Sequence, residues 1–281
     1  MLGEYLRARR ELIRPEDVGL PVYGVRRVAG LRREEVAMLA GISSDYYLRL
    51  EQGRDRNPSV QVLESLARVL GLDRSGTDYL LGLASSRSRQ RARRPKRETV
   101  PTGTRQLLDT LDLPAFVEGR YFDVLAANPL ATALSPNLQV GYNRLHSVFL
   151  DPGEQALYPD WHQATVGIVA GLRTSVGSDV DDPRFVQLVG ELSLASARFR
   201  QLWARHDVQA LEGRPIALAH PQVGDLTLHR EKLAIGGTDG QLLVIYHAEP
   251  GSSSADKLAL LASLARPAVV LPREESEDPI R

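Results

Sequence analysis

A short stretch of the sequence, residues 44–52, carries side chains that can hydrogen-bond to the edges of DNA bases. Its outward polar members, if the stretch is helical, are Ser44, Asp45, Tyr46, Arg49 and Gln52. Short polar groups, an aromatic hydroxyl and a planar guanidinium suit a helix that lies in the major groove, where each base pair presents a distinct pattern of donors and acceptors. The chemistry that this stretch indicates is therefore DNA recognition.

The residues around this stretch, 31–53, predict two short helices joined by a tight turn. Apolar residues recur at helical spacing in the first helix, and Gly41 can adopt the left-handed backbone conformation that ends it. Ser43 is a suitable N-cap for the second helix, whose inward residues are Tyr47 and Leu50. Any two-helix hairpin has a capped turn, so this motif alone does not identify a DNA-binding domain. The flanking sequence must support that interpretation.

Basic residues flank the candidate recognition helix and extend the set of DNA contacts. The additional candidates are Arg33 at the start of the first helix, Ser43 at the turn, and Arg54 and Arg56 in a basic loop after the second helix. Helical periodicity predicts three more helices, at residues 2–12, 60–70 and 73–84. We therefore expect residues 1–85 to form an all-α helix-turn-helix DNA-binding domain.

The formal net charge of zero conceals an asymmetry between the two parts of the chain. Residues 1–97 hold 20 Lys and Arg against 12 Asp and Glu, whereas residues 98–281 hold 15 against 23. A basic first third indicates a module that binds a polyanion, joined to one that does not. Residues 86–101 open with a basic run almost free of apolar side chains, so we expect a linker there. The alternative is an arm that lies along DNA phosphate or in the minor groove.

Residues 102–272 predict a second, α+β domain, which is followed by a frayed tail at 273–281. Strands are expected at residues 115–118, 121–126, 215–220, 225–233 and 241–248, and helices at 104–111, 128–134, 160–175, 182–194, 196–206 and 254–264. Helices in the middle of the chain, with strands on both sides of them, indicate one antiparallel sheet covered on one face.

Two groups of large or polar side chains in this domain are candidates for a ligand site. The candidate residues are Tyr158, Trp161, Phe199, Arg200, Trp203 and His206. Two interpretations remain open for the aromatic members. They form an ordinary core, or they line an apolar pocket in which an arginine or a histidine meets a polar head group.

The rest of the composition argues against enzymatic and membrane classes. The chain has no cysteine, which excludes disulfides and thiol catalysis, and its six histidines follow no metal-binding spacing. The sequence contains no nucleophile elbow, phosphate-binding loop or dinucleotide fingerprint, so we expect no catalytic residue, no metal and no cofactor. It has neither a run of about 20 apolar residues nor a leader-like start, so a cytoplasmic protein is expected.

Several blocks of the sequence resemble known families. The segment LRREEVAMLAGISSDYYLRLEQGRDRNPS, with the helix after it, is similar to the xenobiotic-response-element (Cro/phage-repressor-like) helix-turn-helix family. Five later segments resemble, in the same order, the ligand-binding domain of the MmyB-like transcription regulators. They are LYPDW, DDPRFVQLVGELS, FRQLWARHDV, HPQVGDLTL and HAEPGSSS. Together these blocks cover almost the whole chain.

The resemblance implies a PAS-like α+β sensor domain behind the DNA-binding domain, with a fatty-acid-like ligand. The resemblance implies that Ser44, Asp45 and Arg49 contact the bases. It implies that the DNA backbone is contacted by Arg33, Gln52 and Arg54. Asp45 replaces the glutamine that is common in the phage repressors. A carboxylate at that position favours a cytosine amino group or a bridging water over a purine.

These observations predict a transcription regulator that is controlled by a small apolar or fatty-acid-like ligand. We expect its partners to be double-stranded operator DNA with an inverted repeat and a second copy of the chain in a homodimer. One alternative is a DNA-binding scaffold whose second domain mediates dimerisation or binds a protein partner without a small molecule. Another is a DNA-associated enzyme.

Overall fold

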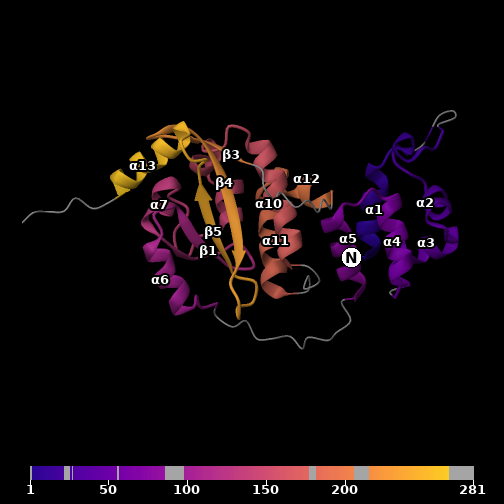
Figure 1. The fold of residues 1–281 in the computed structure, drawn as a ribbon. Coiled ribbons are helices and arrows are strands. Elements are labelled where there is room, and N and C mark those ends of the chain that lie inside the picture. The colour runs from indigo at the N-terminus through magenta and orange to yellow at the C-terminus, as the bar shows by residue number, and fades with distance from the viewer. Residues whose placement is uncertain are drawn as a thin grey trace, which may run out of the picture.

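The computed structural model describes residues 2–21, 26, 28–55, 57–85, 98–176, 182–205 and 215–265. These residues form a helical group in the first third of the chain and a second group built on one sheet (Figure 1). Residues 86–97 of the expected linker, the expected tail and two site candidates, Arg56 and His206, lie outside the described residues. Among the residues that are described, no helix is long and apolar enough to cross a membrane.

The helical group packs its helices around a single core. Its elements are α1 (Leu2–Leu12), the 3-10 helix η1 (Pro15–Val18), α2 (Arg33–Ala40), α3 (Ser44–Glu51), α4 (Val60–Val69) and α5 (Arg74–Ser85). Fully buried side chains from all five α-helices, among them Tyr5, Val36, Tyr47, Leu66 and Leu80, meet in that core. The all-α character expected from the sequence is confirmed, and only η1 was not predicted because four residues are too few to show a period.

The second group is built on a five-stranded antiparallel sheet with the strand order β2-β1-β5-β4-β3. The strands are β1 (Ala115–Glu118), β2 (Val124–Ala127), β3 (Ile216–His220), β4 (Gly224–Ala234) and β5 (Leu242–His247). The register places Phe116 opposite Val244 and Tyr246 opposite Arg230. Because side chains alternate along a strand, these four residues share one face, which we call the inner face.

Eight helices accompany the sheet in the described part of the chain. They are α6 (Thr102–Thr110), α7 (Pro129–Leu134), α8 (Arg144–Leu150), α9 (Pro152–Ala156), α10 (Trp161–Val176), α11 (Pro183–Ala195), α12 (Ala197–Ala204) and α13 (Ser253–Ala265). Helices α7 and α13 pack together against the inner face, and α8, α10, α11 and α12 enclose a second core beside it (Figure 1). Helix α6 covers part of the other face through Leu108, so the expectation of a sheet covered on one face only was wrong.

Other local differences lie around the first hairpin and in the segment after α7. The turn after β1 continues to Asp123, because Phe122 has a left-handed backbone with φ of 68°. Strand β2 therefore begins at Val124 and not at Tyr121, and Phe122 packs into the second core. Helices α8 and α9 were not predicted, because at seven and five residues they are too short to show a helical period.

Candidate nucleic-acid interface and ligand site

The turn between α2 and α3 has the construction that the sequence predicts. Gly41 ends α2 with φ of 70°, a left-handed conformation that costs glycine little. The Ser43 hydroxyl accepts a hydrogen bond from the backbone amide of Tyr46 at 3.1 Å and so caps α3. Tyr47 and Leu50 are fully buried beneath α3, and this burial fixes which side of the helix is left for a partner.

The outer side of α3 carries the candidate base-reading residues. Ser44, Asp45 and Arg49 are exposed, and Tyr46 is half-buried beside them. Nη1 of Arg49 lies 2.8 Å from Oδ2 of Asp45, and its guanidinium carbon lies 5.7 Å from the centre of the Tyr46 ring. An exposed ion pair one helical turn apart stabilises a fold by less than about 1 kcal/mol. Its consequence here is that Asp45 and Tyr46 orient the Arg49 guanidinium on the helix surface.

A buried carboxylate joins α3 to the helices that support it. Oε1 of Glu51 lies 2.6 Å from Nε of Arg10, and Oε2 lies 2.6 Å from Nε of Arg33. Burial alone would raise the pKa of Glu51, but the hydrogen bonds from the two arginines outweigh burial and lower it. Arg33 is still 45 % exposed, so it can reach a DNA phosphate while Glu51 holds it.

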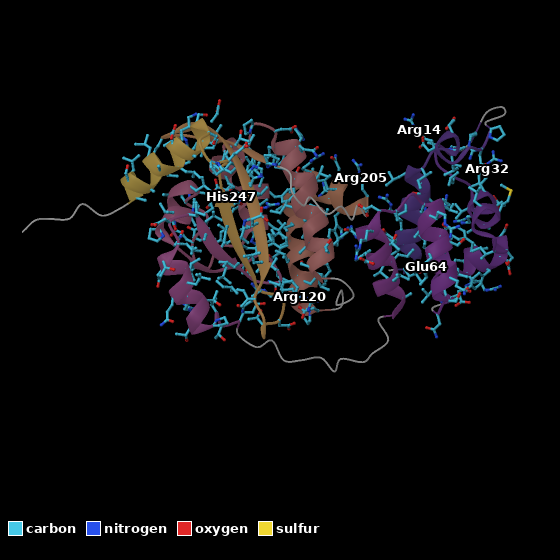
Figure 2. All side chains as sticks on the ribbon, viewed as in Figure 1. Arg14, Arg32, Glu64, Arg120, Arg205 and His247 are labelled. Atoms are coloured by element: carbon cyan, nitrogen blue, oxygen red, sulfur yellow. The ribbon has the colours of Figure 1, made fainter. Side chains whose placement is uncertain are left out.

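The remaining candidate DNA contacts follow the C-terminal end of α3. Gln52 and Arg54 are both exposed there, whereas Arg56 is not described. Arg32, which precedes Arg33 and caps α2, is labelled at the outer edge of the same region in Figure 2. All candidates that the structure describes therefore lie on α3, on its flanking turns or at the start of α2.

Three of the candidate ligand residues meet in an aromatic cluster between α8, α10 and α12. Phe199 is fully buried, with its ring centre 5.2 Å from that of Phe149. Trp203 stacks on Phe199 at 5.7 Å with an angle of 6° between the rings, and the Arg173 guanidinium lies 3.9 Å from the Trp203 ring centre. Trp161 contacts Phe149 at 6.3 Å. The structure thus brings Trp161, Phe199 and Trp203 together, as either interpretation of the sequence requires.

The other candidate ligand residues are placed differently. Tyr158 packs against both cores of the second group, and its hydroxyl donates to Oε1 of Glu154 at 3.2 Å. Arg200 is exposed on α12 and donates to the carbonyl of Ser193, and His206 is not described. The cation at the aromatic cluster is instead Arg173, which spacing in the sequence did not single out.

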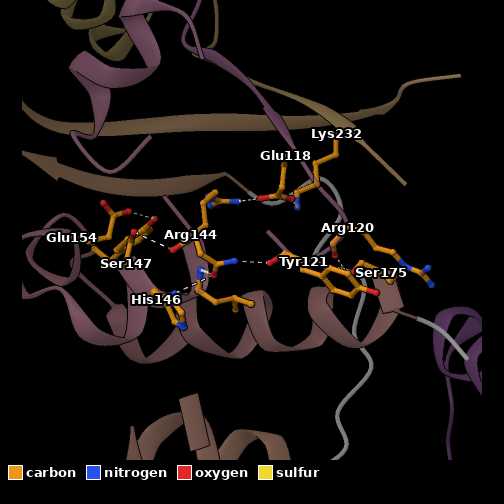
Figure 3. Close-up of polar contacts among 12 residues, drawn as sticks. Glu118, Arg120, Tyr121, Arg144, His146, Ser147, Glu154, Ser175 and Lys232 are labelled. Carbon is orange, nitrogen blue, oxygen red and sulfur yellow. Dashed lines mark hydrogen bonds and ion pairs between the residues drawn. The ribbon is translucent and has the colours of Figure 1, made fainter. Parts of the chain in front are cut away.

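A charged cluster that the sequence did not reveal lies between the inner face and α8 (Figure 3). Glu118 at the end of β1 is 1 % exposed, and its carboxylate oxygens lie 2.5 Å from Nη1 of Arg144 and 2.8 Å from Nζ of Lys232. The Arg144 guanidinium also lies 5.2 Å from the Phe116 ring centre, and the Lys232 ammonium lies 5.0 Å from that of Phe122. This cluster therefore joins α8, β1 and β4 through one carboxylate.

The ionisation of the cluster follows from its pairing. Burial alone would raise the pKa of Glu118, but the charges of Lys232 and Arg144 outweigh burial and lower it to about 2. Burial alone would lower the pKa of Arg144, but the electrostatic interactions with Tyr246 and Glu118 outweigh burial and raise it. Glu118 and Arg144 are therefore ionised at neutral pH and form a buried ion pair.

Known proteins resemble the chain in both of its parts. The family model of the MmyB-like transcription regulator ligand binding domain matches residues 100–261, and a model of a helix-turn-helix domain matches residues 1–80. An uncharacterized HTH-type transcriptional regulator of Sinorhizobium fredii is 46% identical over 55 residues, which cover 20% of this chain and 70% of that protein. The two resemblances read from the sequence blocks are thereby confirmed.

Proposed function

Because the chain belongs to the family of MmyB-like transcription regulators, we propose that α3 reads its operator and that its second domain senses a small apolar or fatty-acid-like ligand, without catalysing a reaction. The observation that carries the DNA-binding part is the exposed polar side of α3, opposite an inner side that is fully buried. A helix with one side held in a core and a polar outer side can enter the major groove without unfolding its domain.

The proposed base contacts centre on Arg49. A guanidinium in the middle of a recognition helix can donate two hydrogen bonds to O6 and N7 of guanine. The contacts of Arg49 with Asp45 and Tyr46 restrict its side chain before DNA binds, which lowers the entropy lost on binding. Asp45 can keep this role in the complex, or it can accept a hydrogen bond from a cytosine amino group or a bridging water.

Arg49→Ala is expected to weaken binding to the operator by about 1–3 kcal/mol and to relax the preference at one base pair. Selection from random DNA followed by titration measures both effects. Arg54→Ala is the matched control, since it removes an exposed arginine just after α3. It should weaken binding to all sequences alike and lower the slope of log K against log salt by about one. An unchanged sequence preference in Arg49→Ala would refute the assignment of α3 as the reading helix.

The proposed ligand lies against the aromatic cluster of the second domain. Trp161 and Trp203 are half-buried whereas Phe199 is fully buried, so the cluster extends from the core to the surface. Apolar walls with a few polar groups are typical of small-molecule sites. The proposed ligand contacts are Tyr158, Trp161, Phe199 and Trp203, with Arg200 and His206 as the further candidates. The competing interpretation, an ordinary core, makes a different prediction for truncation of Trp203.

We also propose that the regulator binds DNA as a homodimer held partly by its second domain. One short helix reads few base pairs, and two heads on half-sites about 34 Å apart gain both affinity and specificity. The apolar residues Val186 and Leu194 on α11 are 56% and 87% exposed, so they offer apolar surface to a second chain.

Sedimentation is expected to show a dimer for the full chain and a monomer for residues 1–97. The shorter piece keeps the whole core of the helical group but lacks the second domain, which carries the proposed dimer contacts. In the full chain, Val186→Glu and Leu194→Glu together should shift the equilibrium toward monomer, because a charge must be desolvated at the interface. Equal dimerisation of the full chain and the shorter piece would remove the second domain from this role.

A further inference from the structure

The inner face of the sheet carries a polar pair that the contacts described above do not use. Arg230 on β4 lies directly opposite Tyr246 on β5. Tyr246 is only 4 % exposed, and its ring stacks on Phe116 with the centres 6.4 Å apart. Arg230 is half-buried. Both side chains therefore project toward the helices that cover this face.

Neither polar group has a partner within the ranges that the structure describes. From the described residues, no hydrogen bond or ion pair reaches the Arg230 guanidinium, and none reaches the Tyr246 hydroxyl. The neighbouring cations differ in this respect, since Arg144 and Lys232 both contact Glu118. Neither the Arg230 guanidinium nor the Tyr246 hydroxyl is among the fully buried polar atoms that lack a partner in the described part of the chain, and Arg230 is only half-buried. A ligand can therefore reach both groups from the same face of the sheet.

Tyr158 adds a third polar group at the same place. Its hydroxyl donates to Glu154, and its side chain packs against both cores. Burial is the main cause that raises the pKa of Tyr158. Glu154 and Tyr246 raise it further, while Arg144 and Arg230 act in the opposite direction. Tyr158 packs against the same core cluster that contains Tyr246, so its side chain lies near the inner face that carries the pair.

Arg230 differs from the neighbouring cations in its ion pairing. In the described part of the chain, Arg144 and Lys232 pair with Glu118, whereas Arg230 has no carboxylate within ion-pair distance. Water screens the charge of this half-buried guanidinium less than it would screen a fully exposed one. A single anion that accepts hydrogen bonds would satisfy the guanidinium of Arg230 and the hydroxyl of Tyr246 together.

We propose that Arg230 and Tyr246 anchor the anionic head group, a carboxylate or a phosphate, of the ligand that the second domain senses. This inference rests on the proposed function, which supplies the ligand, and it moves the charged end away from Arg200 and His206. The guanidinium donates two parallel hydrogen bonds to the head group, and the Tyr246 hydroxyl donates a third. The apolar chain of the ligand then extends past Tyr158, which contacts both cores.

The test is thermal unfolding and titration of the full chain with dodecanoate, dodecyl phosphate and uncharged dodecanol. We expect at least one of the anionic probes to raise the Tm of the wild type more than dodecanol does. Arg230→Gln should abolish this difference and weaken binding of that probe about ten- to hundredfold, and Arg230→Lys should retain part of the affinity. Tyr246→Phe, which removes only a hydroxyl, should weaken binding less and leave the ligand-free Tm nearly unchanged.

The matched control is His229→Gln, since His229 precedes Arg230 on β4 and its side chain projects from the opposite face. It should leave all three Tm shifts unchanged. Equal stabilisation by charged and uncharged probes, or unaltered shifts in Arg230→Gln and Tyr246→Phe, would overturn the anchor and leave ligand sensing intact. No Tm shift with any probe would overturn both. The anion with the larger Arg230-dependent shift identifies the head group.

Discussion

Glu118→Ala is expected to lower the free energy of unfolding of the second domain by about 3–5 kcal/mol. The substitution removes the partner of Arg144, whose side chain is buried, and of the partly exposed Lys232. A buried guanidinium without a counter-ion must be hydrated, and hydration requires α8 to move away from the sheet (Figure 3). Chemical denaturation followed by tryptophan fluorescence measures the loss, because both tryptophans of the chain, Trp161 and Trp203, lie in the second domain.

Lys232→Met is the matched control for this prediction. It removes only the outer cation and leaves the buried pair of Glu118 and Arg144 in place, so it should cost much less than Glu118→Ala. If Glu118→Ala and Lys232→Met lowered the free energy of unfolding by equally small amounts, the buried pair of Glu118 and Arg144 would not be what holds α8 on the sheet.

The cluster of Glu118, Arg144 and Lys232 should make the free energy of unfolding of the second domain depend on pH under acidic conditions. Burial would raise the pKa of Glu118, but Lys232 and Arg144 lower it from 4.5 to about 2. A carboxylate with a depressed pKa in the folded state stabilises the protein above its unfolded pKa, and this contribution is lost as the pH falls from about 4.5 toward 2. In Glu118→Gln the titrating group is absent, so the free energy of unfolding should vary less with pH across this window.

The helix-turn-helix could be predicted from the sequence because its determinants act over a few residues. Gly41, Ser43, Tyr47 and Leu50 were identified by residue type and spacing, and the structure confirms their turn, cap and core positions. Capping and helical periodicity are local, so the chain carries their signal without any knowledge of the fold. The base contacts of Arg49 stay a prediction, because they depend on a partner that lies outside the chain.

The charged cluster could not be predicted, because its members are distant in sequence. Glu118 lies 26 residues from Arg144 and 114 residues from Lys232. Only the pairing of β1 with β5 and of β5 with β4, and the packing of α8, brings the three together. The same holds for Arg230 and Tyr246, whose pairing depends on the register of two strands. The one local signal was a glutamate at the end of an apolar strand.

Phe199→Ala is expected to destabilise the ligand-free protein by about 3–5 kcal/mol, whereas Trp203→Ala should cost less. Phe199 is fully buried, with its ring centre 5.2 Å from Phe149 and 5.7 Å from Trp203, so truncation leaves a cavity that its neighbours cannot fill. Trp203 is half-buried at the edge of the cluster, where solvent or a ligand can occupy the space that its ring leaves. Thermal melts of both variants without ligand measure the difference.

The same two variants distinguish a pocket from an ordinary core when a fatty acid is added. With a pocket at the edge of the cluster, dodecanoate raises the Tm of the wild type, and Trp203→Ala cancels most of that rise because the ligand loses its wall. Gln201→Ala, which shortens another exposed side chain of the same helix, is the control and should keep the wild-type shift. A core without a pocket requires the opposite pattern. Trp203→Ala would then cost as much as Phe199→Ala, and dodecanoate would leave the Tm of the wild type unchanged.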